Sequence, residues 1–303
     1  MPDGICSGRV VVITGAGNGL GRAHALAFAA EGARVVVNDL GGGRDGAGAS
    51  AGPAQAVVDE IRAAGGLAVA NTDDVSDWDG ARRLVEQAID GFGGLDVLVN
   101  NAGILRDRTV AAMTEPEWDA VIAVHLKGSF APLRHAAAYW RERSKAGAAN
   151  DARVVNTTSP SGVFGNPGQG NYAAAKAGIA ALTVVAAREL GRYGVTVNAI
   201  APTAMTRLTE DIPVMRRAAE TADLAPEAVS PLVVWLGSAA SRDVTGRVFA
   251  VAGSRITVLE GWANGPAVDR PTRWAPAELS GVVPDLVAKA APNADPTGER
   301  PGG

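Results

Sequence analysis

A serine, a tyrosine and a lysine are spaced along this chain for the transfer of one proton. Tyr172 and Lys176 lie four residues apart at the start of an Ala-rich stretch, 173–187, that predicts a helix, so both side chains fall on one face, one turn apart. A free phenol titrates at about pH 10, and a neighbouring ammonium lowers that pKa toward the range that a general acid–base catalyst needs. Ser159 follows the apolar run 153–158, where its hydroxyl is placed to hydrogen-bond a substrate carbonyl. The alternative is an ordinary exposed helix pair, since i, i+4 pairs are common on helix surfaces.

A glycine-rich turn near the amino terminus predicts a dinucleotide site. The apolar run 9–13 is typical of a buried parallel strand, and it leads through the glycines into a helical stretch, 22–31. Such glycines let the backbone approach a pyrophosphate, and the helix amino terminus supplies free N–H groups. A tight turn without a ligand is the alternative. The residues expected at the pyrophosphate are Gly15, Gly17, Asn18, Gly19, Leu20 and Gly21.

An aspartate ends the second strand-like run, 33–38. Asp39 stands about twenty residues beyond the glycines, where a carboxylate accepts hydrogen bonds from the adenosine ribose and repels a 2′-phosphate. The sequence therefore favours NAD over NADP as cofactor. A solvated aspartate at a strand end is the alternative.

The order of the apolar runs predicts the fold. Strand-like runs alternate with helical segments, which indicates a doubly wound parallel α/β sheet of seven strands, a Rossmann fold, covered on both faces. The seven runs are 9–13, 33–38, 67–70, 95–99, 153–158, 195–200 and 247–251. We expect one domain over 1–254 that holds the cofactor and the active site, a carboxy-terminal extension over 255–290, and a disordered tail over 291–303. Ligands bind beyond the carboxyl ends of such strands.

With these motifs in their order, residues 8–255 resemble the short-chain dehydrogenase/reductase family. The strand 95–99 is followed by a segment similar to the family's central Asn-Asn-Ala-Gly motif, which packs beside the adenine and ribose. Earlier in the chain, an Asp-Val pair is similar to the family's pair at the adenine ring. The residues concerned are Asn101, Ala102, Gly103, Asp74 and Val75. The resemblance implies that Tyr172 shuttles the proton, that Lys176 lowers its pKa and holds the nicotinamide ribose, and that Ser159 steadies the substrate oxygen.

Two segments depart from the family pattern. His125 stands where most members have an asparagine that shapes a helix and supports a water chain to the lysine. An imidazole carries a donor and an acceptor and could serve such a relay, and a structural buried histidine is the alternative. The run 201–207 lacks the usual Pro-Gly, yet Pro202 and Met205 are still expected beside the nicotinamide.

These departures are shared with a subgroup. Segments 8–23, 35–52, 100–108 and 165–171 are similar to the (3R)-hydroxyacyl-CoA dehydrogenase part of peroxisomal multifunctional enzyme type 2, also named as a 17β-hydroxysteroid dehydrogenase. That resemblance implies oxidation of a 3-hydroxyacyl-CoA thioester with NAD, with a fatty, branched or sterol-derived tail. The alternatives are a 3-oxoacyl thioester reductase, a hydroxysteroid dehydrogenase, and a non-catalytic NAD-binding sensor. We expect a substrate lid over 203–226. A CoA substrate needs local positive charge, and an ordinary surface position is the favoured alternative for each candidate. The candidates are Arg106, Arg108, Arg207, Arg216 and Arg217.

Composition limits the partners. The net charge is −4, from 28 basic and 32 acidic residues, and no stretch is strongly basic, so neither nucleic acid nor an anionic membrane is expected as a partner. The sole cysteine, Cys6, fits a reducing cytoplasm, and no apolar run is long enough to span a bilayer. The three histidines show no metal-ligand spacing, so no metal is expected. The resemblance places the apolar helix after Lys176 in the interface of a homodimer or homotetramer.

Overall fold

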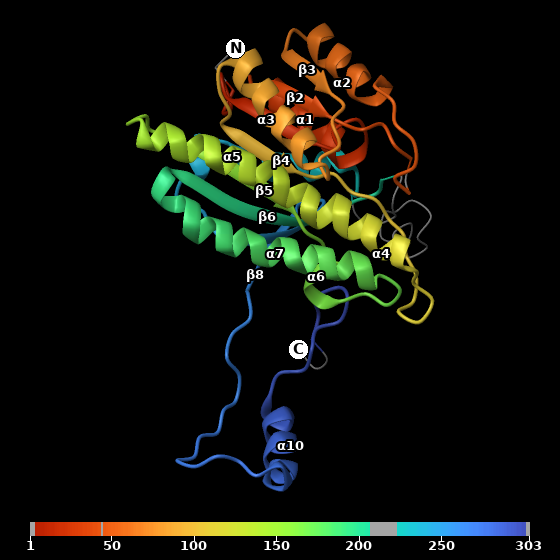
Figure 1. Ribbon diagram of the computed structural model, residues 1–303, viewed down its shortest axis with the longest axis vertical. Coiled ribbons are helices and arrows are strands. Elements are labelled where there is room, and N and C mark those ends of the chain that lie inside the picture. The colour runs from red at the N-terminus through yellow and green to blue at the C-terminus, as the bar shows by residue number, and fades with distance from the viewer. Residues whose placement is uncertain (1–3, 44, 207–222, 301–303) are drawn as a thin grey trace.

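The protein, seen in a computed structural model that describes residues 4–43, 45–206 and 223–300, is built on one eight-stranded sheet (Figure 1). The strand order is β3-β2-β1-β4-β5-β6-β7-β8, and all neighbours pair in parallel except β7 and β8. The strands are β1 (Val10–Thr14), β2 (Arg34–Asn38), β3 (Leu67–Asn71), β4 (Val97–Asn100), β5 (Ala152–Thr157), β6 (Val195–Thr203), β7 (Val248–Ala252) and β8 (Arg255–Leu259). The order reverses between β1 and β4, and a doubly wound sheet binds its ligands at the carboxyl end of that reversal.

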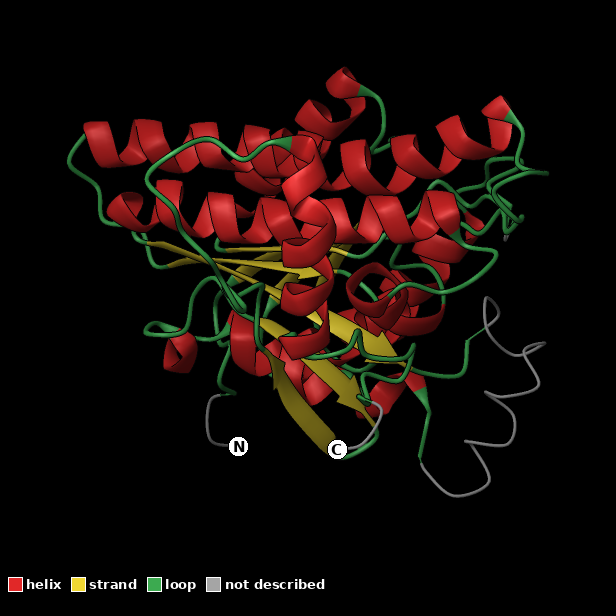
Figure 2. Ribbon diagram, turned by 90° about the horizontal axis from the view of Figure 1, so that it is seen from below, coloured by secondary structure: helices red, strands yellow, loops and turns green. Residues whose placement is uncertain are grey.

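Helices cover both faces of the sheet (Figure 2). On one face α1 (Gly19–Ala30), α2 (Gly52–Ala63) and α9 (Ser230–Gly237) enclose a core with Val11 and Ile13 of β1. On the other face α3 (Trp78–Phe92), α5 (Gly128–Lys145) and α7 (Gly170–Leu190) enclose a second core with Val10 and Val12. Because successive side chains of a strand alternate between two buried faces, each central strand must be apolar throughout.

Shorter helical segments lie between the longer helices and strands. They are α4 (Glu115–Val121), the π-helical turn η1 (Ile122–Lys127), α6 (Pro160–Phe164), η2 (Gly191–Tyr193), η3 (Pro226–Ala228), η4 (Ala239–Ser241) and η5 (Pro276–Glu278). Among the helices of the described ranges, none is both long enough and apolar enough to cross a membrane.

The expected strand count of seven needs correction. Residues 255–259, assigned to the extension, form the eighth strand, which pairs antiparallel with β7. Gly253 and Ser254 make the two-residue connection, with Gly253 at φ +55°, a conformation that suits a tight hairpin turn. The sequence carried this signal, since Gly-Ser separates two β-branched runs.

Beyond β8 the chain leaves the body as a long arm that carries α10 (Leu279–Lys289) and then returns (Figure 1). On its return Gly298 lies against the ring of Phe164, and residues 295–299 form a hydrogen-bonded turn. The division of the chain into domain, extension and disordered tail stays a prediction. Most of the expected lid, 207–222, lies outside the described residues.

The sole cysteine lies inside the body, beneath α9. Cys6 is fully buried, its Sγ is 3.6 Å from the carbonyl oxygen of Val234, and burial raises the pKa of its thiol to about 11. It therefore stays a protonated, inaccessible thiol at ordinary pH.

Candidate active site

The fold brings Ser159, Tyr172 and Lys176 together beyond the carboxyl end of β5. Ser159 caps α6, where its Oγ accepts a hydrogen bond from the backbone N–H of Ser161 at 3.2 Å. Tyr172 and Lys176 lie in the first turns of α7, and the Lys176 Nζ stands 5.5 Å from the centre of the Tyr172 ring. The Nζ also donates to the carbonyl oxygen of Thr157 at 2.6 Å, so the last residue of the strand fixes the lysine. The predicted group is thus assembled from one strand end and one helix.

Close backbone packing holds the two helices of this group. The hydroxyl of Thr158 donates to the carbonyl oxygen of Lys176 at 2.6 Å. A Cβ added at Gly162 would lie 2.5 Å from the Cβ of Lys176, which is too close for any side chain. Glycine in α6 therefore lets this helix seat Ser159 directly against α7.

Burial dominates the electrostatics of the group. Burial lowers the pKa of Lys176 from 10.5 to about 7. Burial also raises the pKa of Tyr172, and it outweighs the lowering by a hydrogen bond with Ser159; the charge of Asp107 raises that pKa further. The lowering of the Tyr172 pKa by Lys176 stays a prediction, because burial penalises the phenolate and also favours the neutral form of the lysine.

His125 lies in the π-helical turn η1 and packs edge-on to Tyr172, with ring centres 5.1 Å apart. Its Nε2 is 3.0 Å from the backbone nitrogen and 2.8 Å from the carbonyl oxygen of Ile104, and its Nδ1 is buried with no hydrogen-bond partner among the residues that the structure describes. Burial lowers the pKa of His125 to about 3, so the ring is neutral at ordinary pH. His125 therefore lines the site around Tyr172, and π-helical turns are frequent at functional sites.

A buried amide network beside the group was missed by the sequence reasoning. Gln169 donates through Nε2 to the Asp107 carboxylate at 2.8 Å, and its Oε1 accepts from the Ser161 hydroxyl at 2.8 Å. Asn171, fully buried, donates to the carbonyl oxygens of Arg106 and Glu117, both at 3.0 Å. Both amides therefore tie the loop after β4 to the start of α7. No periodicity marks such residues, and their only signal was their place directly before the tyrosine.

The glycine turn is as tight as a dinucleotide cradle requires. Gly15 has φ +62°, and a Cβ there would lie 2.7 Å from the Cα of Ala102; a Cβ at Gly21 would overlap the carbonyl oxygen of Gly15. Asn101 donates through Nδ2 to the carbonyl oxygens of Thr14 at 3.0 Å and Gly15 at 3.1 Å. The backbone N–H groups of both Asn101 and Ala102 donate to the Thr14 hydroxyl. The strand-end motif of β4 thus fastens the turn after β1.

Asp39 is joined to the same turn. One carboxylate oxygen accepts from the backbone N–H of Gly17 at 2.8 Å, and the other accepts from that of Gly41 at 2.7 Å. The side chain of Asp39 is buried, and any Cβ at Gly17 would meet its carboxylate at 2.7 Å. The acidic group therefore lies at the cradle itself, as a ribose-binding carboxylate must.

The remaining predicted cofactor residues lie along the same edge of the sheet. Asn18 precedes α1, and Leu20 packs in its first turn. The Asp74 carboxylate accepts from the backbone and hydroxyl of Ser76, at 2.8 and 2.7 Å, and Val75 is buried against α5. Pro202 is the penultimate residue of β6, Met205 follows the strand, and Gly103 abuts the His125 ring.

Two of the arginines considered as candidates for CoA binding are described. Arg106 donates to the carbonyl oxygen of Asp45 at 3.0 Å, and Arg108 pairs with Glu117 at 3.2 Å. Each is therefore engaged in a surface contact beside the predicted site. Arg207, Arg216 and Arg217 lie outside the described residues.

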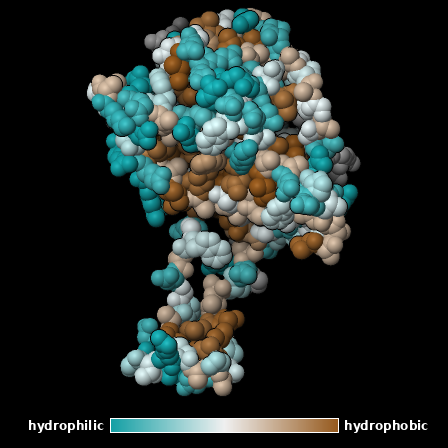
Figure 3. Space-filling view, in the orientation of Figure 1, coloured by the Kyte–Doolittle hydropathy of each residue, from teal (hydrophilic) through white to brown (hydrophobic). Residues whose placement is uncertain are grey.

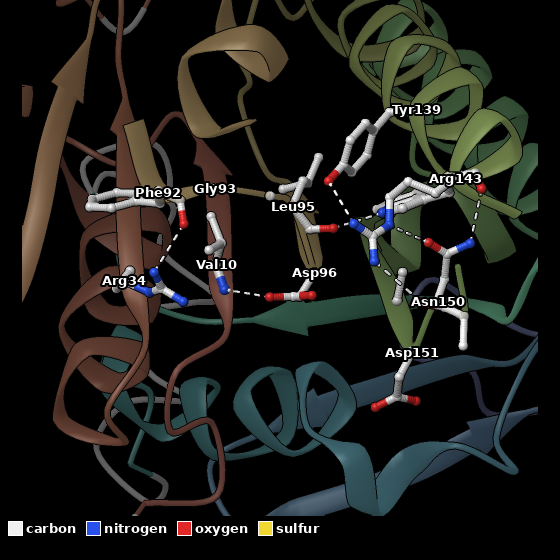
Figure 4. Close-up of a pocket in the computed structure, with 14 residues that line it drawn as sticks. Val10, Arg34, Phe92, Gly93, Leu95, Asp96, Tyr139, Arg143, Asn150 and Asp151 are labelled. Atoms are coloured by element: carbon white, nitrogen blue, oxygen red, sulfur yellow. Dashed lines mark hydrogen bonds between the residues drawn. The ribbon is translucent and has the colours of Figure 1, made fainter. Parts of the chain in front are cut away.

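A polar cavity of about 170 Å³ opens at the opposite, amino-terminal end of the strands (Figure 4). Its guanidinium groups are already bonded: Arg34 donates to the carbonyl oxygen of Phe92 at 2.9 Å, and Arg143 to the side chain of Asn150 at 3.0 Å. None of the predicted site residues lines this cavity. The hydrogen bonds of its lining residues connect strand starts to helix ends, and the cavity is separate from the candidate active site.

Comparisons with known proteins agree with this geometry. Residues 9–213 match the family model described as short chain dehydrogenase. The chain is 47% identical to "Hydroxyacyl-CoA dehydrogenase ChsB1" of Mycobacterium tuberculosis, over 94% of this chain and 90% of that protein. It is 48% identical to "Peroxisomal multifunctional enzyme type 2" of Mus musculus, over 76% of this chain but only 30% of the mouse protein. A solved short chain dehydrogenase from Mycobacterium avium superposes with a TM-score of 0.87 at 63% identity, covering 96% of this chain and 99% of that one. The protein belongs to the short-chain dehydrogenase family, whose members are oxidoreductases that act on CH–OH groups with a nicotinamide cofactor.

Proposed function

We propose that this protein is an NAD-dependent (3R)-3-hydroxyacyl-CoA dehydrogenase of β-oxidation. One observation carries the chemistry: a partly buried tyrosine meets a buried lysine and serine at the same sheet edge as a glycine cradle that holds a carboxylate. The substrate class rests on the names of the relatives, which are 47% and 48% identical to this chain over the aligned residues.

In this proposal Tyr172 is the general base for alcohol oxidation. The substrate hydroxyl would hydrogen-bond both Tyr172 and Ser159, whose hydroxyls already interact with each other. Tyr172 would take the hydroxyl proton, and Ser159 would donate to the oxygen as it becomes a carbonyl. When bound, the nicotinamide ring supplies the chemistry of hydride acceptance. Lys176, fixed by Thr157, would hold positive charge beside the phenolate that forms.

The residues of the cradle support NAD as the cofactor. The Gly15, Gly17 and Gly21 positions admit no Cβ because neighbouring protein atoms fill that space, which fits the tightly packed glycine turn of a dinucleotide site. Asp39 carries negative charge at the end of β2, and a carboxylate there favours a free ribose hydroxyl over a phosphate. The other residues proposed to hold the cofactor are those predicted from the sequence, including Asn101, Asp74 and Pro202.

Initial rates with a substrate panel test this function. Formation of NADH and of NADPH would be followed with straight-chain and sterol-derived 3-hydroxyacyl-CoA thioesters and with free hydroxysteroids. We expect turnover of thioesters with NAD at least tenfold above that with NADP, and the preferred tail would identify the substrate. Turnover confined to free alcohols would overturn the thioester assignment, and a preference for NADPH would point to the reductase alternative.

A variant without the phenol hydroxyl tests the mechanism. Tyr172→Phe should lower kcat at least 10³-fold, because general base catalysis is lost, while NAD binding measured by calorimetry is kept. Tyr193→Phe, in η2, is the matched control and should keep the wild-type rate. A Tyr172→Phe variant with half the wild-type rate would contradict the assignment. Binding of NAD without turnover by the wild-type protein would instead favour the sensor alternative.

A further inference from the structure

A buried asparagine lies between the two walls of the proposed adenosine pocket. Asn71 is the last residue of β3 and pairs in parallel register with Asn38, the last residue of β2. Its backbone carbonyl oxygen accepts from the N–H of Asp39 at 3.0 Å, and the chain continues from Asn71 to Asp74 and Val75. Asn71 therefore stands between the carboxylate that we assign to the ribose and the pair that we assign to the adenine.

The side-chain amide of Asn71 is buried and fully hydrogen-bonded. Its Oδ1 accepts from the Nδ2 of Asn38 at 2.7 Å and from the backbone N–H of Asp73 at 3.0 Å. Its Nδ2 donates to the Asp73 carboxylate at 2.9 Å and to the Oε1 of Gln87 at 2.7 Å. An asparagine amide offers two donor hydrogens and two acceptor lone pairs, so these four bonds saturate it.

The two asparagines fasten the segment that leads to Asp74. The Nδ2 of Asn38 also donates to the carbonyl oxygen of Asp73 at 2.9 Å, so the N–H and the C=O of Asp73 are both held by side chains at strand ends. The N–H of Ala16, in the glycine turn, donates to the carbonyl oxygen of Asn38 at 2.8 Å. The ends of β2 and β3 thus connect the glycine turn to the start of the adenine wall.

Helix α3 closes this network on its outer side. Gln87 donates to the carbonyl oxygen of Ala70 at 3.0 Å, and Arg83 donates to the Asp73 carboxylate at 2.8 Å. Figure 3 shows hydrophilic side chains gathered over α3, and Arg83 among them is 53% exposed. An exposed ion pair contributes little to a fixed geometry, whereas saturated buried amides hold their neighbours in one arrangement. The position of the segment therefore depends chiefly on Asn71.

We propose that Asn71 is a positioning residue for the adenosine half of the cofactor, whose amide holds Asp74 and Val75 in place relative to Asp39. The proposal rests on the proposed function, in which NAD is the cofactor. The four partners of the amide are all protein groups, so Asn71 acts through the walls of the pocket. A pocket that is already ordered binds its ligand more tightly, because less conformational freedom is lost on binding.

Calorimetric binding of ADP-ribose to the full-length protein tests this role without turnover, because ADP-ribose carries the adenosine half and lacks the nicotinamide. Asn71→Ala should raise the Kd for ADP-ribose and for NAD by the same factor, roughly tenfold or more, because Asp74 and Val75 are no longer held. At saturating NAD its kcat should stay within about twofold of wild type, since the lost contacts serve binding rather than the transition state.

Asn150→Ala is the matched control, because it also removes a hydrogen-bonded amide, but at the amino-terminal end of the strands. It should leave both Kd values within about twofold of wild type, although it destabilises the fold. Gln87→Met removes only one partner of Asn71 at similar volume, and it should weaken ADP-ribose binding about threefold. This second variant provides the test if Asn71→Ala does not fold.

Unchanged Kd values in Asn71→Ala, or equal weakening by Asn150→Ala, would overturn the proposal. If Asn71→Ala does not fold, unchanged binding of ADP-ribose by Gln87→Met would overturn it. These outcomes leave the proposed function intact, because the wild-type protein would still bind NAD. A wild-type protein that binds neither NAD nor ADP-ribose would overturn the proposed function and the role of Asn71 with it.

Discussion

Burial sets the protonation states of the residues that we assign to catalysis. Lys176 is held by one backbone carbonyl, and desolvation brings its pKa to about 7, while the neutral ring of His125 packs edge-on to Tyr172. A buried lysine costs stability unless its charge is compensated. The site therefore carries a destabilising group that its chemistry requires.

Lys176→Met should stabilise the protein in a pH-dependent manner. The folded-state pKa of about 7 lies below the ordinary 10.5, so the unfolded chain binds more protons between these values, and wild-type stability rises with pH across that window. The cost that Lys176 imposes is thus largest below pH 7 and fades as pH rises toward 10.5. We expect the variant to melt roughly 2–6 °C above wild type at pH 6.5, and the gap to close toward pH 10.

Scanning calorimetry across that pH range measures the gap. The control is Lys145→Met, at a lysine that is 61% exposed, which should leave the melting temperature unchanged at every pH. A variant at position 176 that melts below wild type at pH 6.5 would show that the bond to Thr157 outweighs the desolvation cost.

Asp107→Asn should shift the pH dependence of oxidation. The charge of Asp107 raises the pKa of Tyr172, so its removal lowers that pKa, and the acidic limb of kcat/KM should move to lower pH. The amide oxygen still accepts from Gln169, so we expect kcat/KM on the plateau to stay within about threefold of wild type.

The pH–rate profile measures this shift, with Asp285→Asn on the distant arm as the control. An unmoved acidic limb would mean that Asp107 acts only through its hydrogen bond with Gln169.

The sequence did predict Tyr172 and Lys176, because i, i+4 spacing fixes which side chains share a helix face. It did not predict Asp107 and Gln169, because loop side chains meet through tertiary contacts that no local period encodes.

At the scale of elements, apolar runs located the ends of the parallel strands to within three residues. Each run is continuously apolar because helices cover both faces of the sheet, and this run of apolar residues is visible in the sequence. The eighth strand was missed because Arg255–Leu259 is an exposed edge strand, so the Gly-Ser turn signal before it was not joined by a buried apolar face. The π-helical turn at 122–127 was also missed, since one extra residue in a helix leaves hardly any trace in hydrophobic periodicity.

Asn150→Ala should loosen the junction of three elements without changing the chemistry. The Asn150 amide donates to the carbonyl oxygens of Trp140 in α5 and Tyr193 in η2, both at 2.9 Å, and accepts from Arg143 at 3.0 Å. Its loss leaves these groups unpaired and should cost about 2–3 kcal/mol of unfolding free energy. Urea denaturation measures that cost. The kcat at 20 °C should remain that of wild type, and a cost under 0.5 kcal/mol would contradict this role.

At the scale of the whole molecule, α7 suggests that the protein is an oligomer. Its solvent-facing side is an apolar stripe formed by Ala174, Ala177, Ala181 and Val185, whereas the exposed side of a monomer's helix is usually polar. We propose a homodimer or homotetramer assembled through this stripe, working in the cytoplasm. The sequence indicated the helix, but only the folded chain identifies which side of it stays uncovered.

Ala181→Glu should weaken that assembly. A charge in the middle of the stripe would be buried without a partner in the interface, which is strongly unfavourable. Light scattering after size-exclusion chromatography should show the mass fall toward the 30.7 kDa of one chain. Ala56→Glu, on the exposed side of α2, is the matched control and should leave the mass unchanged. An unchanged mass for Ala181→Glu would place the interface elsewhere.

The sole thiol of the chain has a consequence for how the enzyme senses its surroundings. Cys6 is sealed beneath α9 and remains protonated, so peroxide, glutathione and alkylating agents find no nucleophilic sulfur on the body. Oxidative stress would then reach this catalyst through the ratio of oxidised to reduced nicotinamide rather than through cysteine modification.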